Sequence, residues 1–292
     1  MDRSNKTLFS ILFSAPAFIL FSVFMVVPMG LSAYYSLTDW HGIGEPVFRG
    51  FGNFIEMFGS KEYYTAMLNT LFLVALSLLV KVPAAVCIAY LLYRTVRGFR
   101  TFRVILFFPV VIAPVAIGLM FSIILNADIG PMGNLFTSIG LPQFDIVWLS
   151  NPKYVLWAVT LPQIWQNLGL HIIIFLAGMQ TVTDDVLESA RIDGATSSMV
   201  FRKIMLPLIA EVSQVSIILT VTGALKSFGY AWVMTGGGPG YASTFFAILM
   251  YVKAFEESNF GYSSAMSITV LAYALTFTVL FKFIYGRFLS KD

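Results

Sequence analysis

Cysteine, histidine and charged residues are all scarce in this sequence. Its 292 residues include one cysteine and two histidines, and 11% are charged, against about a quarter in an ordinary soluble domain. Cys87 therefore has no partner for an internal disulfide. His41 and His171 lie far apart with no cysteine cluster near them, so the spacing of a metal site is missing. These shortages argue against a metal centre, redox chemistry and a soluble enzyme.

Apolar residues take the place of the missing polar ones. They make up 58% of the chain, with 28 Phe and 13 Met, and the mean hydropathy is +0.82. This surplus is too large to bury in one core, so lipid must serve as part of the solvent. The net charge is +3, but the basic residues form short clusters between apolar runs. The clusters indicate membrane topology, and no nucleic-acid partner is expected.

Six apolar runs are each long enough to cross a bilayer as a helix, which takes about 20 residues. Alternation of polar and apolar residues with a period of two is absent, which favours helices over a barrel. We therefore predict an all-α bundle of six transmembrane helices in one domain, residues 1–292. The first run exceeds the apolar core of a signal peptide, about 7–15 residues, and is expected to remain as a span. The predicted spans are 8–36, 68–93, 104–125, 155–180, 208–233 and 263–286.

The basic residues also predict the orientation, because Lys and Arg collect in cytoplasmic loops. With the N-terminus inside, the basic cluster from Arg94 to Arg103 and the pair Arg202 and Lys203 are cytoplasmic. Both termini then lie in the cytoplasm, and the protein is a multi-pass component of the cytoplasmic membrane. The outer segments hold only Arg49, Lys61, Lys153 and Lys253.

The cytoplasmic segment between the fourth and fifth spans contains signals for a separate short helix. Thr183 or Asp184 can cap its start, and Glu188 lies near the end where the helix dipole favours an anion. Gly194 can adopt the left-handed conformation that ends a helix. A second helix is expected to begin near Ser197, with one apolar face. Taken alone, this pattern fits equally well a helix-turn-helix at the membrane surface or a solvated amphipathic linker.

The same segment resembles the EAA signature of permease subunits in bacterial ABC importers. The resembling residues are Glu188-Ser189-Ala190, Asp193-Gly194-Ala195, Phe201, Ile204 and Leu206-Pro207. The sugar-importer branch is the most similar, and Thr235-Gly236-Gly237-Gly238-Pro239 is typical of its MalF-like half. Ser189 replaces the commoner alanine, and the chain lacks the extra spans and large outer domain of MalF itself.

The resemblance implies a type I ABC importer fold with cytoplasmic coupling helices at about 184–207. It implies three kinds of protein partner: a second, MalG-like permease, two ATPase subunits and an extracytoplasmic binding protein that docks on the outer loops. The implied coupling residues, which contact the ATPase, are Glu188, Ser189, Ala190, Asp193, Gly194, Ala195, Phe201, Ile204, Leu206 and Pro207.

An importer needs an energy source, and the sequence restricts what that source can be. Two stretches with glycine were compared with the phosphate-binding motif G-x-x-x-x-G-K-[ST], and neither matches it: Gly236-Gly237-Gly238-Pro239-Gly240 and Gly223-Ala224-Leu225-Lys226-Ser227. We therefore expect no cofactor on this chain and no enzyme activity, with ATP and Mg bound by the partner subunits. Ion coupling would place acidic residues inside the spans, yet they fall in loops or, like Glu211, near the cytoplasmic mouth. An ATPase partner acting on the cytoplasmic helix is the remaining source.

Polar residues recur on one face of the fourth span and on one face of the fifth. Gln163, Gln166, Asn167 and His171 share the first face; Ser216, Thr220, Gly223 and Ser227 share the second. The pattern fits solute binding and helix–helix contact equally well. The resemblance implies that seven residues line the substrate path: Gln166, Asn167, Leu170, Thr220, Gly223, Ala224 and Ser227. We add Gln163, because its spacing places it on the same face of the fourth span.

Neutral amides and hydroxyls suit the hydroxyl groups of a sugar, so we predict transport of a sugar or oligosaccharide. Two lysines within spans, Lys81 and Lys226, keep an anionic solute open, such as a glycerol phosphate or an acidic sugar. Two other classes also stay open: a self-sufficient carrier or channel, and a non-transporting scaffold or sensor.

Overall fold

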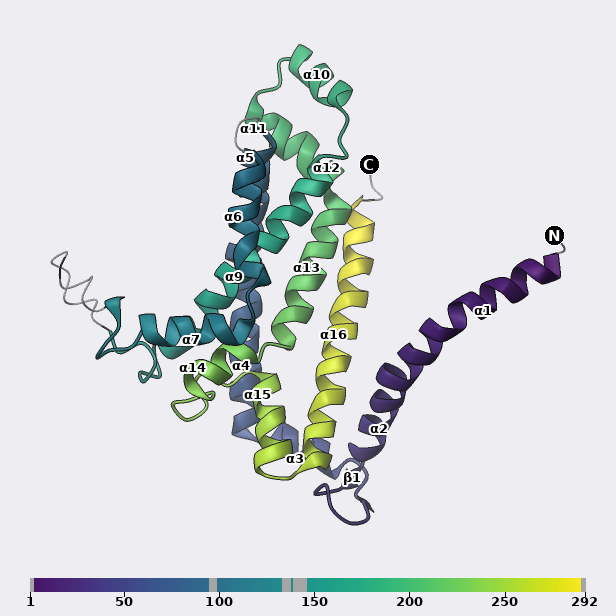
Figure 1. Cartoon of the computed structure of the whole chain (residues 1–292), viewed down its shortest axis with the longest axis vertical. Coiled ribbons are helices and arrows are strands. Elements are labelled where there is room, and N and C mark those ends of the chain that lie inside the picture. The colour runs from purple at the N-terminus through teal and green to yellow at the C-terminus, as the bar shows by residue number, and fades with distance from the viewer. Residues whose placement is uncertain (1–2, 95–98, 133–137, 139–145, 290–292) are drawn as a thin grey trace. The chain divides into compact units, whose positions relative to one another are not determined.

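The computed structural model describes residues 3–94, 99–132, 138 and 146–289, so part of the basic cluster, 95–98, lies outside the described residues. The chain forms two compact units. The first comprises Met1–Ser60 and Met250–Ala272, and the second Lys61–Leu249 and Tyr273–Asp292. Figure 1 shows that helices make up nearly all of both units. The single domain predicted for residues 1–292 stays a prediction.

The first unit begins with one long helix. Three consecutive segments form it without a break: α1 (Arg3–Phe21), the π-helical turn η1 (Ser22–Val26) and α2 (Val27–Tyr35). Residues 12–35 are long and apolar enough to span a membrane, and none of the most apolar window is buried. Side chains such as Phe24 are exposed by 72%, which suits a helix whose solvent is lipid.

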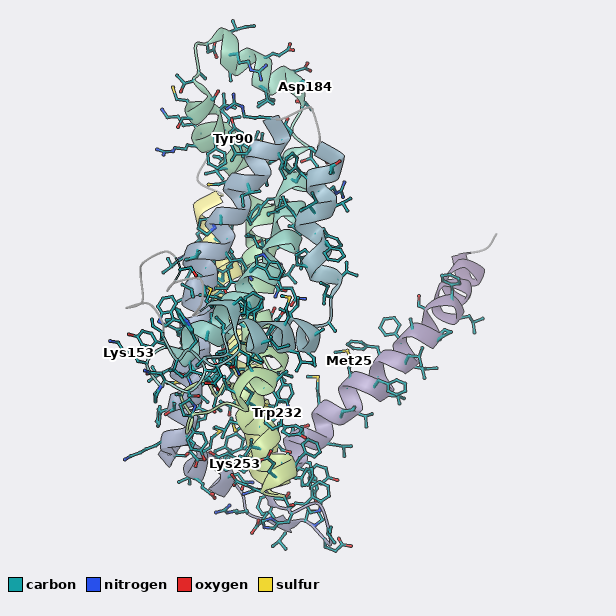
Figure 2. The ribbon with its side chains drawn as sticks, turned by 60° about the vertical axis from the view of Figure 1, so that its left-hand side comes forward. Met25, Tyr90, Lys153, Asp184, Trp232 and Lys253 are labelled. Carbon is teal, nitrogen blue, oxygen red and sulfur yellow. The ribbon has the colours of Figure 1, made fainter. Side chains whose placement is uncertain are left out.

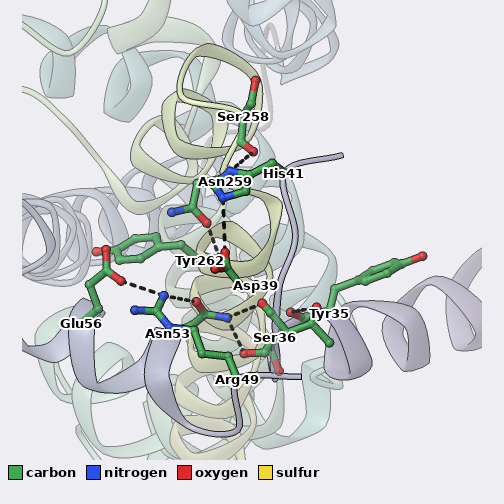
Figure 3. A network of polar contacts seen from close by, with 11 residues as sticks. Tyr35, Ser36, Asp39, His41, Arg49, Asn53, Glu56, Ser258, Asn259 and Tyr262 are labelled. Atoms are coloured by element: carbon green, nitrogen blue, oxygen red, sulfur yellow. Dashed lines mark hydrogen bonds and ion pairs between the residues drawn. The ribbon is translucent and has the colours of Figure 1, made fainter. Parts of the chain in front are cut away.

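A polar network holds the loop that follows this helix (Figure 3). Asn53 is fully buried and donates from Nδ2 to the carbonyls of Ser36 (2.9 Å) and Thr38 (2.8 Å). Arg49 donates to Asn53 Oδ1 and to Glu56. The elements of this region are β1 (Thr38–Asp39), paired antiparallel with β2 (Val47–Phe48), and α3 (Gly52–Gly59).

The second unit is built around one central helix, α9 (Val155–Met179), which contacts α5, α6, α7, α13 and α14. Glycines on α9 permit this close packing: a β-carbon on Gly169 would collide with the Leu106 carbonyl of α6, and one on Gly178 with Val212 of α13. The surrounding elements are α4 (Lys61–Leu76), η2 (Ser77–Lys81), α5 (Val82–Arg94), α6 (Phe99–Val111), α7 (Pro114–Ile124), α13 (Ala210–Leu225) and α14 (Gly229–Thr235).

The remaining elements follow α9 in the chain, either between the fourth and fifth spans or after α14. They are α10 (Asp184–Ile192), α11 (Ser197–Met199), η4 (Val200–Met205), α12 (Leu206–Leu208), α15 (Phe246–Tyr251), η5 (Val252–Glu256) and α16 (Phe260–Leu289).

Five of the six predicted spans correspond to apolar helical segments long enough to cross a membrane, and the fifth span is interrupted at residues 226–228, between α13 and α14. In the part of the chain that the structure describes, five helices are long and apolar enough to cross a membrane. The prediction of an all-α, polytopic helical bundle is therefore confirmed. The five are Leu12–Tyr35, Lys61–Arg94, Val155–Met179, Ala210–Thr235 and Phe260–Arg287.

The third predicted span, 104–125, differs from the expected continuous helix. It consists of α6 and α7, which meet at a bend of 92°. Pro114 is the first residue of α7, and Ala113 before it has an extended backbone, with ψ of 136°. A proline disfavours helical geometry in the preceding residue and lacks the N–H that would continue the ladder. The prolines therefore break this segment rather than merely kink it.

The side chain of Gln166 on α9 donates to two backbone carbonyls at the break, of which Pro109 also accepts from the Ile112 N–H. The Gln166 Nε2 donates to the carbonyls of Pro109 (2.9 Å) and Ile112 (2.6 Å), and its Oε1 accepts from the Tyr230 hydroxyl (2.6 Å). Only 3% of Gln166 is exposed. Backbone groups freed at prolines in membrane helices need such partners from neighbouring helices. Gln166 thus joins α6, α9 and α14 at the bend.

We expect Gln166→Leu to destabilise the protein, because the Ile112 carbonyl loses its donor and the Pro109 carbonyl keeps only the Ile112 N–H. The free energy of unfolding should fall by about 1–3 kcal/mol, measured as a lower midpoint of thermal unfolding in detergent. Gln180→Leu is the matched control, since this exposed glutamine lies at the C-cap of the same helix. A midpoint for Gln166→Leu equal to that of the control would contradict the capping role.

Candidate functional site

The first helix predicted between the fourth and fifth spans, α10, has the boundaries that the sequence predicts. Thr183 is the N-cap residue, with an extended backbone, but its side chain makes no capping hydrogen bond. Asp184 and Asp185 occupy the first turn, where the helix dipole favours anions. Gly194 follows the helix with a φ of +81°, a conformation that costs other residues about 1–2 kcal/mol. The helix is therefore closed at its C-terminal end by a glycine turn.

The second helix of this segment begins at Ser197, as expected, and continues through α11, η4 and α12. Its N-cap is Thr196, whose hydroxyl accepts from the Met199 N–H at 3.3 Å. The sequence prediction did not name Thr196, although threonine is a common N-cap residue.

The apolar side of these two helices is buried against membrane spans. Leu187 and Ala190 of α10 and Met205 of η4 belong to one buried cluster. The same cluster contains residues of α5, such as Ala89, and of α9, such as Phe175. The segment 184–207, called the coupling segment below, is therefore packed onto α5 and α9 rather than solvated on all sides.

The exposed side of the coupling segment is mostly polar but includes three large apolar side chains, Val186, Ile192 and Met199. Ile192 is 85% exposed and Val186 is 41% exposed. Figure 2 labels Asp184 and Tyr90 near this end of the second unit, and Trp232 and Lys153 toward the other. Among the predicted coupling residues, Ala190 is buried; Ala195, Phe201, Ile204 and Leu206 are half-buried; and Glu188, Ser189, Asp193, Gly194 and Pro207 are exposed.

Tyr90 connects the coupling segment to the second span by a specific contact. Its hydroxyl donates to the Ser197 carbonyl at 3.0 Å, and its ring centroid lies 4.5 Å from that of Phe201. Tyr90 belongs to α5, so α5 is bound to the segment by a hydrogen bond as well as by apolar packing. Sequence reasoning missed this residue, because a tyrosine near the end of a span is equally typical of the membrane interface.

A cavity of about 230 Å³ lies inside the second unit. It is lined from three directions, by η2 with Ser77 and Lys81, by α9 and by α13. The structure brings six of the eight predicted substrate residues to its wall. The full lining is Ser77, Lys81, Gln163, Asn167, Leu170, His171, Leu219, Thr220, Gly223 and Ala224.

Hydrogen bonds between α9 and the fifth span surround this cavity. His171 Nδ1 lies 2.7 Å from Ser216 Oγ, and Nε2 lies 3.4 Å from Thr220 Oγ1. Asn167 Nδ2 donates to the carbonyl of Gln163 at 2.8 Å. Part of the polar face on α9 therefore serves helix–helix contact.

Two predicted substrate residues are not among the lining residues of this cavity. Ser227 donates to Gln163 Oε1 at 2.7 Å, and Gln166 caps the α6 carbonyls described above. Conversely, Lys81 and Ser77 come to the cavity wall from the second span. Their spacing in the sequence could not show which way they point.

Comparison with known proteins identifies the family. Residues 81–291 match the family described as binding-protein-dependent transport system inner membrane component. The chain belongs to this family. It is 31% identical over 283 residues to the probable ABC transporter permease YurN of Bacillus subtilis, covering 96% of both chains. It is 29% identical to the diacetylchitobiose uptake system permease NgcF of Streptomyces coelicolor, covering 94% of this chain and 82% of that one.

Solved structures are similar in fold. A permease chain of a bacterial ABC transporter that imports the acidic polysaccharide alginate superposes with a TM-score of 0.82 at 23% identity, covering 98% of this chain and 96% of that one. The same kind of transporter, in complex with its pentasaccharide-bound periplasmic protein, gives a TM-score of 0.84 at 23% identity over the same shares. The predicted ABC importer permease fold is thereby confirmed.

Membership in the family confirms the predicted class. The chain is an ABC transporter permease, a multi-pass component of the inner membrane that works in a binding-protein-dependent system. Neither alternative class, the self-sufficient carrier or channel and the scaffold or sensor, gains support from the comparisons.

Proposed function

We propose that this chain forms one half of the membrane pathway of an ATP-driven importer for a sugar or oligosaccharide. The observation that carries the proposal is that the coupling segment and the polar cavity share α9, and that η2 at the cavity wall continues directly into α5, which packs against the segment. Relatives named for diacetylchitobiose uptake and for trehalose/maltose transport support a carbohydrate substrate. The full assembly would include a second, MalG-like permease, two ATPase subunits and an extracytoplasmic binding protein.

The outward face of α10 is the proposed contact with an ATPase. Its exposed Glu188 and Asp193 offer charges, and the exposed Ile192 offers apolar area, a combination suited to a cleft in another protein. The ATPase would supply the ATP and Mg sites, since this chain has no phosphate-binding motif. This chain is then the mechanical part of the importer and hydrolyses nothing itself.

Movement at the coupling segment would reach the cavity through two helices. Along α9, Phe175 and Met179 pack in the cluster beneath the segment, and Asn167 and His171 line the cavity about two turns away. Along the second span, Tyr90 contacts the segment while Ser77 and Lys81 of η2 border the cavity. Closely packed helices shift as units, so closure of the ATPases would reorient the cavity walls.

The opposite end of the second unit offers a surface for the binding protein. The loop after α14 turns at Gly236 and Gly237, with φ of +60° and +89°. Asn69 of α4 stabilises it by donating to the carbonyls of Tyr241 (3.0 Å) and Thr244 (3.0 Å). A rigid, exposed loop is suited to docking another protein. With the coupling segment inside, this loop faces outward and both chain termini lie in the cytoplasm.

The cavity chemistry favours a sugar as the solute. Amides of Gln163 and Asn167 and the hydroxyl of Thr220 can exchange hydrogen bonds with sugar hydroxyls. Among the lining residues there is no carboxylate that a coupling proton or sodium ion would use. Coupling to ATP through the partner subunits is therefore favoured over coupling to an ion gradient.

The ATPase contact is tested by reversing the charge of its exposed glutamate. We expect Glu188→Lys to reduce co-purification of the ATPase subunits with the permease by at least about 10-fold, because the reversed charge opposes the complementary cleft. Glu45→Lys makes the same change on an exposed outer loop and should leave co-purification unchanged. Equal recovery of ATPase with both variants would refute the contact.

The link through Tyr90 is tested by removing its hydroxyl alone. Tyr90→Phe keeps the ring on Phe201 but loses the bond to the Ser197 carbonyl. We expect ATP hydrolysis to persist while sugar uptake per ATP falls by about 2- to 10-fold, the equivalent of one hydrogen bond. Tyr93→Phe, on the same helix, serves as the control. An unchanged ratio of uptake to hydrolysis in proteoliposomes would argue against this link.

The cavity is tested by making its wall apolar. Replacing Asn167 and Thr220 together with Leu removes two hydrogen-bonding groups, so we expect uptake to fall by at least about 10-fold. Assembly with the partners should survive. Thr222→Leu is the control, because Thr222 lies on the same helix outside the cavity lining. Normal uptake by the double variant would show that this cavity is not the binding site of the solute.

A further inference from the structure

Lys81 is the one charged residue that lines the cavity. It is the last residue of η2, the π-helical turn inside the second span, and Ser77 at the start of the same turn also lines the cavity. Such turns add a residue to the helix and occur often at functional sites. Only 6% of Lys81 is exposed, so its ammonium is buried within a span yet borders an open space.

No carboxylate neutralises this ammonium within the described part of the chain. The ion pairs there join Asp39 to His41, Arg49 to Glu56, and Lys253 to Glu257, and none includes Lys81. Lys81 also makes no hydrogen bond to any described residue. In particular, it does not donate to a backbone carbonyl that lacks an N–H partner because of the nearby Pro83. A buried, unpaired charge is costly in a membrane protein and is retained where it has a function.

Most of the neutral polar side chains of α9 and α13 around the cavity already have partners in the protein. His171 contacts Ser216 and Thr220, Asn167 donates to the Gln163 carbonyl, and Gln163 accepts from Ser227. The Lys81 ammonium has three donors and uses none of them among the described residues. The Lys81 ammonium is therefore the group in the cavity with the most unused hydrogen-bonding capacity, and an anion would satisfy it.

We infer that Lys81 selects a sugar that carries a carboxylate, such as a uronic acid or an oligosaccharide containing one. This inference rests on the proposed function as a sugar importer. The amides and hydroxyls of the cavity would bind the sugar hydroxyls, and the ammonium would bind the carboxylate by a charge-assisted hydrogen bond. One ammonium balances the single charge of a carboxylate, whereas a phosphate monoester carries about −1.5 to −2 at neutral pH. The charge of the cavity thus matches an acidic sugar better than a sugar phosphate.

The test compares matched sugars on the assembled permease–ATPase complex in lipid nanodiscs, without the binding protein. The probes are glucose with glucuronate, galactose with galacturonate, mannose with mannuronate, and cellobiose with cellobiouronate. Members of each pair differ only in a carboxylate that replaces a hydroxymethyl group. Calorimetric titration should show that wild type binds an acidic sugar at least about 10-fold more tightly than its neutral match, the usual gain from a hydrogen bond to a charged group.

Three variants separate charge from packing. Lys81→Met keeps the length of the side chain and should abolish the preference for the acidic sugar. Lys81→Arg keeps the charge and should retain part of it. Lys226→Met removes an exposed cation at the end of α13, outside the cavity lining, and should change nothing. If Lys81→Met fails to assemble, the wild-type preference and the arginine variant still decide the question.

The outcomes that overturn the inference are distinct from failure of the proposed function. A wild type that binds a neutral sugar at least as tightly as its acidic match removes the role of Lys81 but leaves the importer intact. A preference for acidic sugars that survives in Lys81→Met has the same effect. Loss of the second permease from the Lys81→Met complex, without an acid preference in wild type, would show that Lys81 pairs with that subunit. If no sugar of either kind binds or is taken up, the proposed function itself fails.

Discussion

The apolar face of the coupling segment cannot leave the spans beneath it without exposing buried side chains. Leu187 and Met205 pack in one cluster with Ala89 and Phe175, and opening such a cluster costs about 25 cal/mol for each Å² of apolar surface exposed to water. A push on the surface segment must therefore displace α5 and α9 with it. Because α9 lines the cavity together with η2 and α13, and η2 continues into α5, the same packing connects the proposed motor contact to the proposed solute path.

A second constraint is that polar groups within lipid need partners. Gln166 donates to two carbonyls at the break between α6 and α7, and His171 bonds to the fifth span. These residues keep the walls of the cavity in place. Lys81 differs from these groups, since its ammonium is buried, has no protein partner in the described structure and borders the cavity. The contrast between satisfied neutral groups and an unsatisfied cation is what suggests an acidic sugar.

Much of this architecture was predictable from the sequence because hydropathy and helix caps are local signals. Five spans, the start of α10 and the turn at Gly194 follow from short runs of residues. The bend of 92° at Pro114 was not predictable, since a proline in a span can either kink it or break it. Nor could spacing on α9 distinguish Asn167, at the cavity, from Gln166, at a helix contact. That distinction depends on which neighbour each side chain meets in three dimensions.

The claim that the coupling segment moves together with the spans is tested most directly by distance measurement in the working importer. Spin labels at Ile192 on α10 and at Leu161 on α9, in a Cys87→Ser background, report on one rigid element if the account is right. The distance distribution between them should then stay the same when ATP binds and the transporter turns over. A clear shift in that distance on ATP binding would show that the segment moves independently of α9, and would contradict the account.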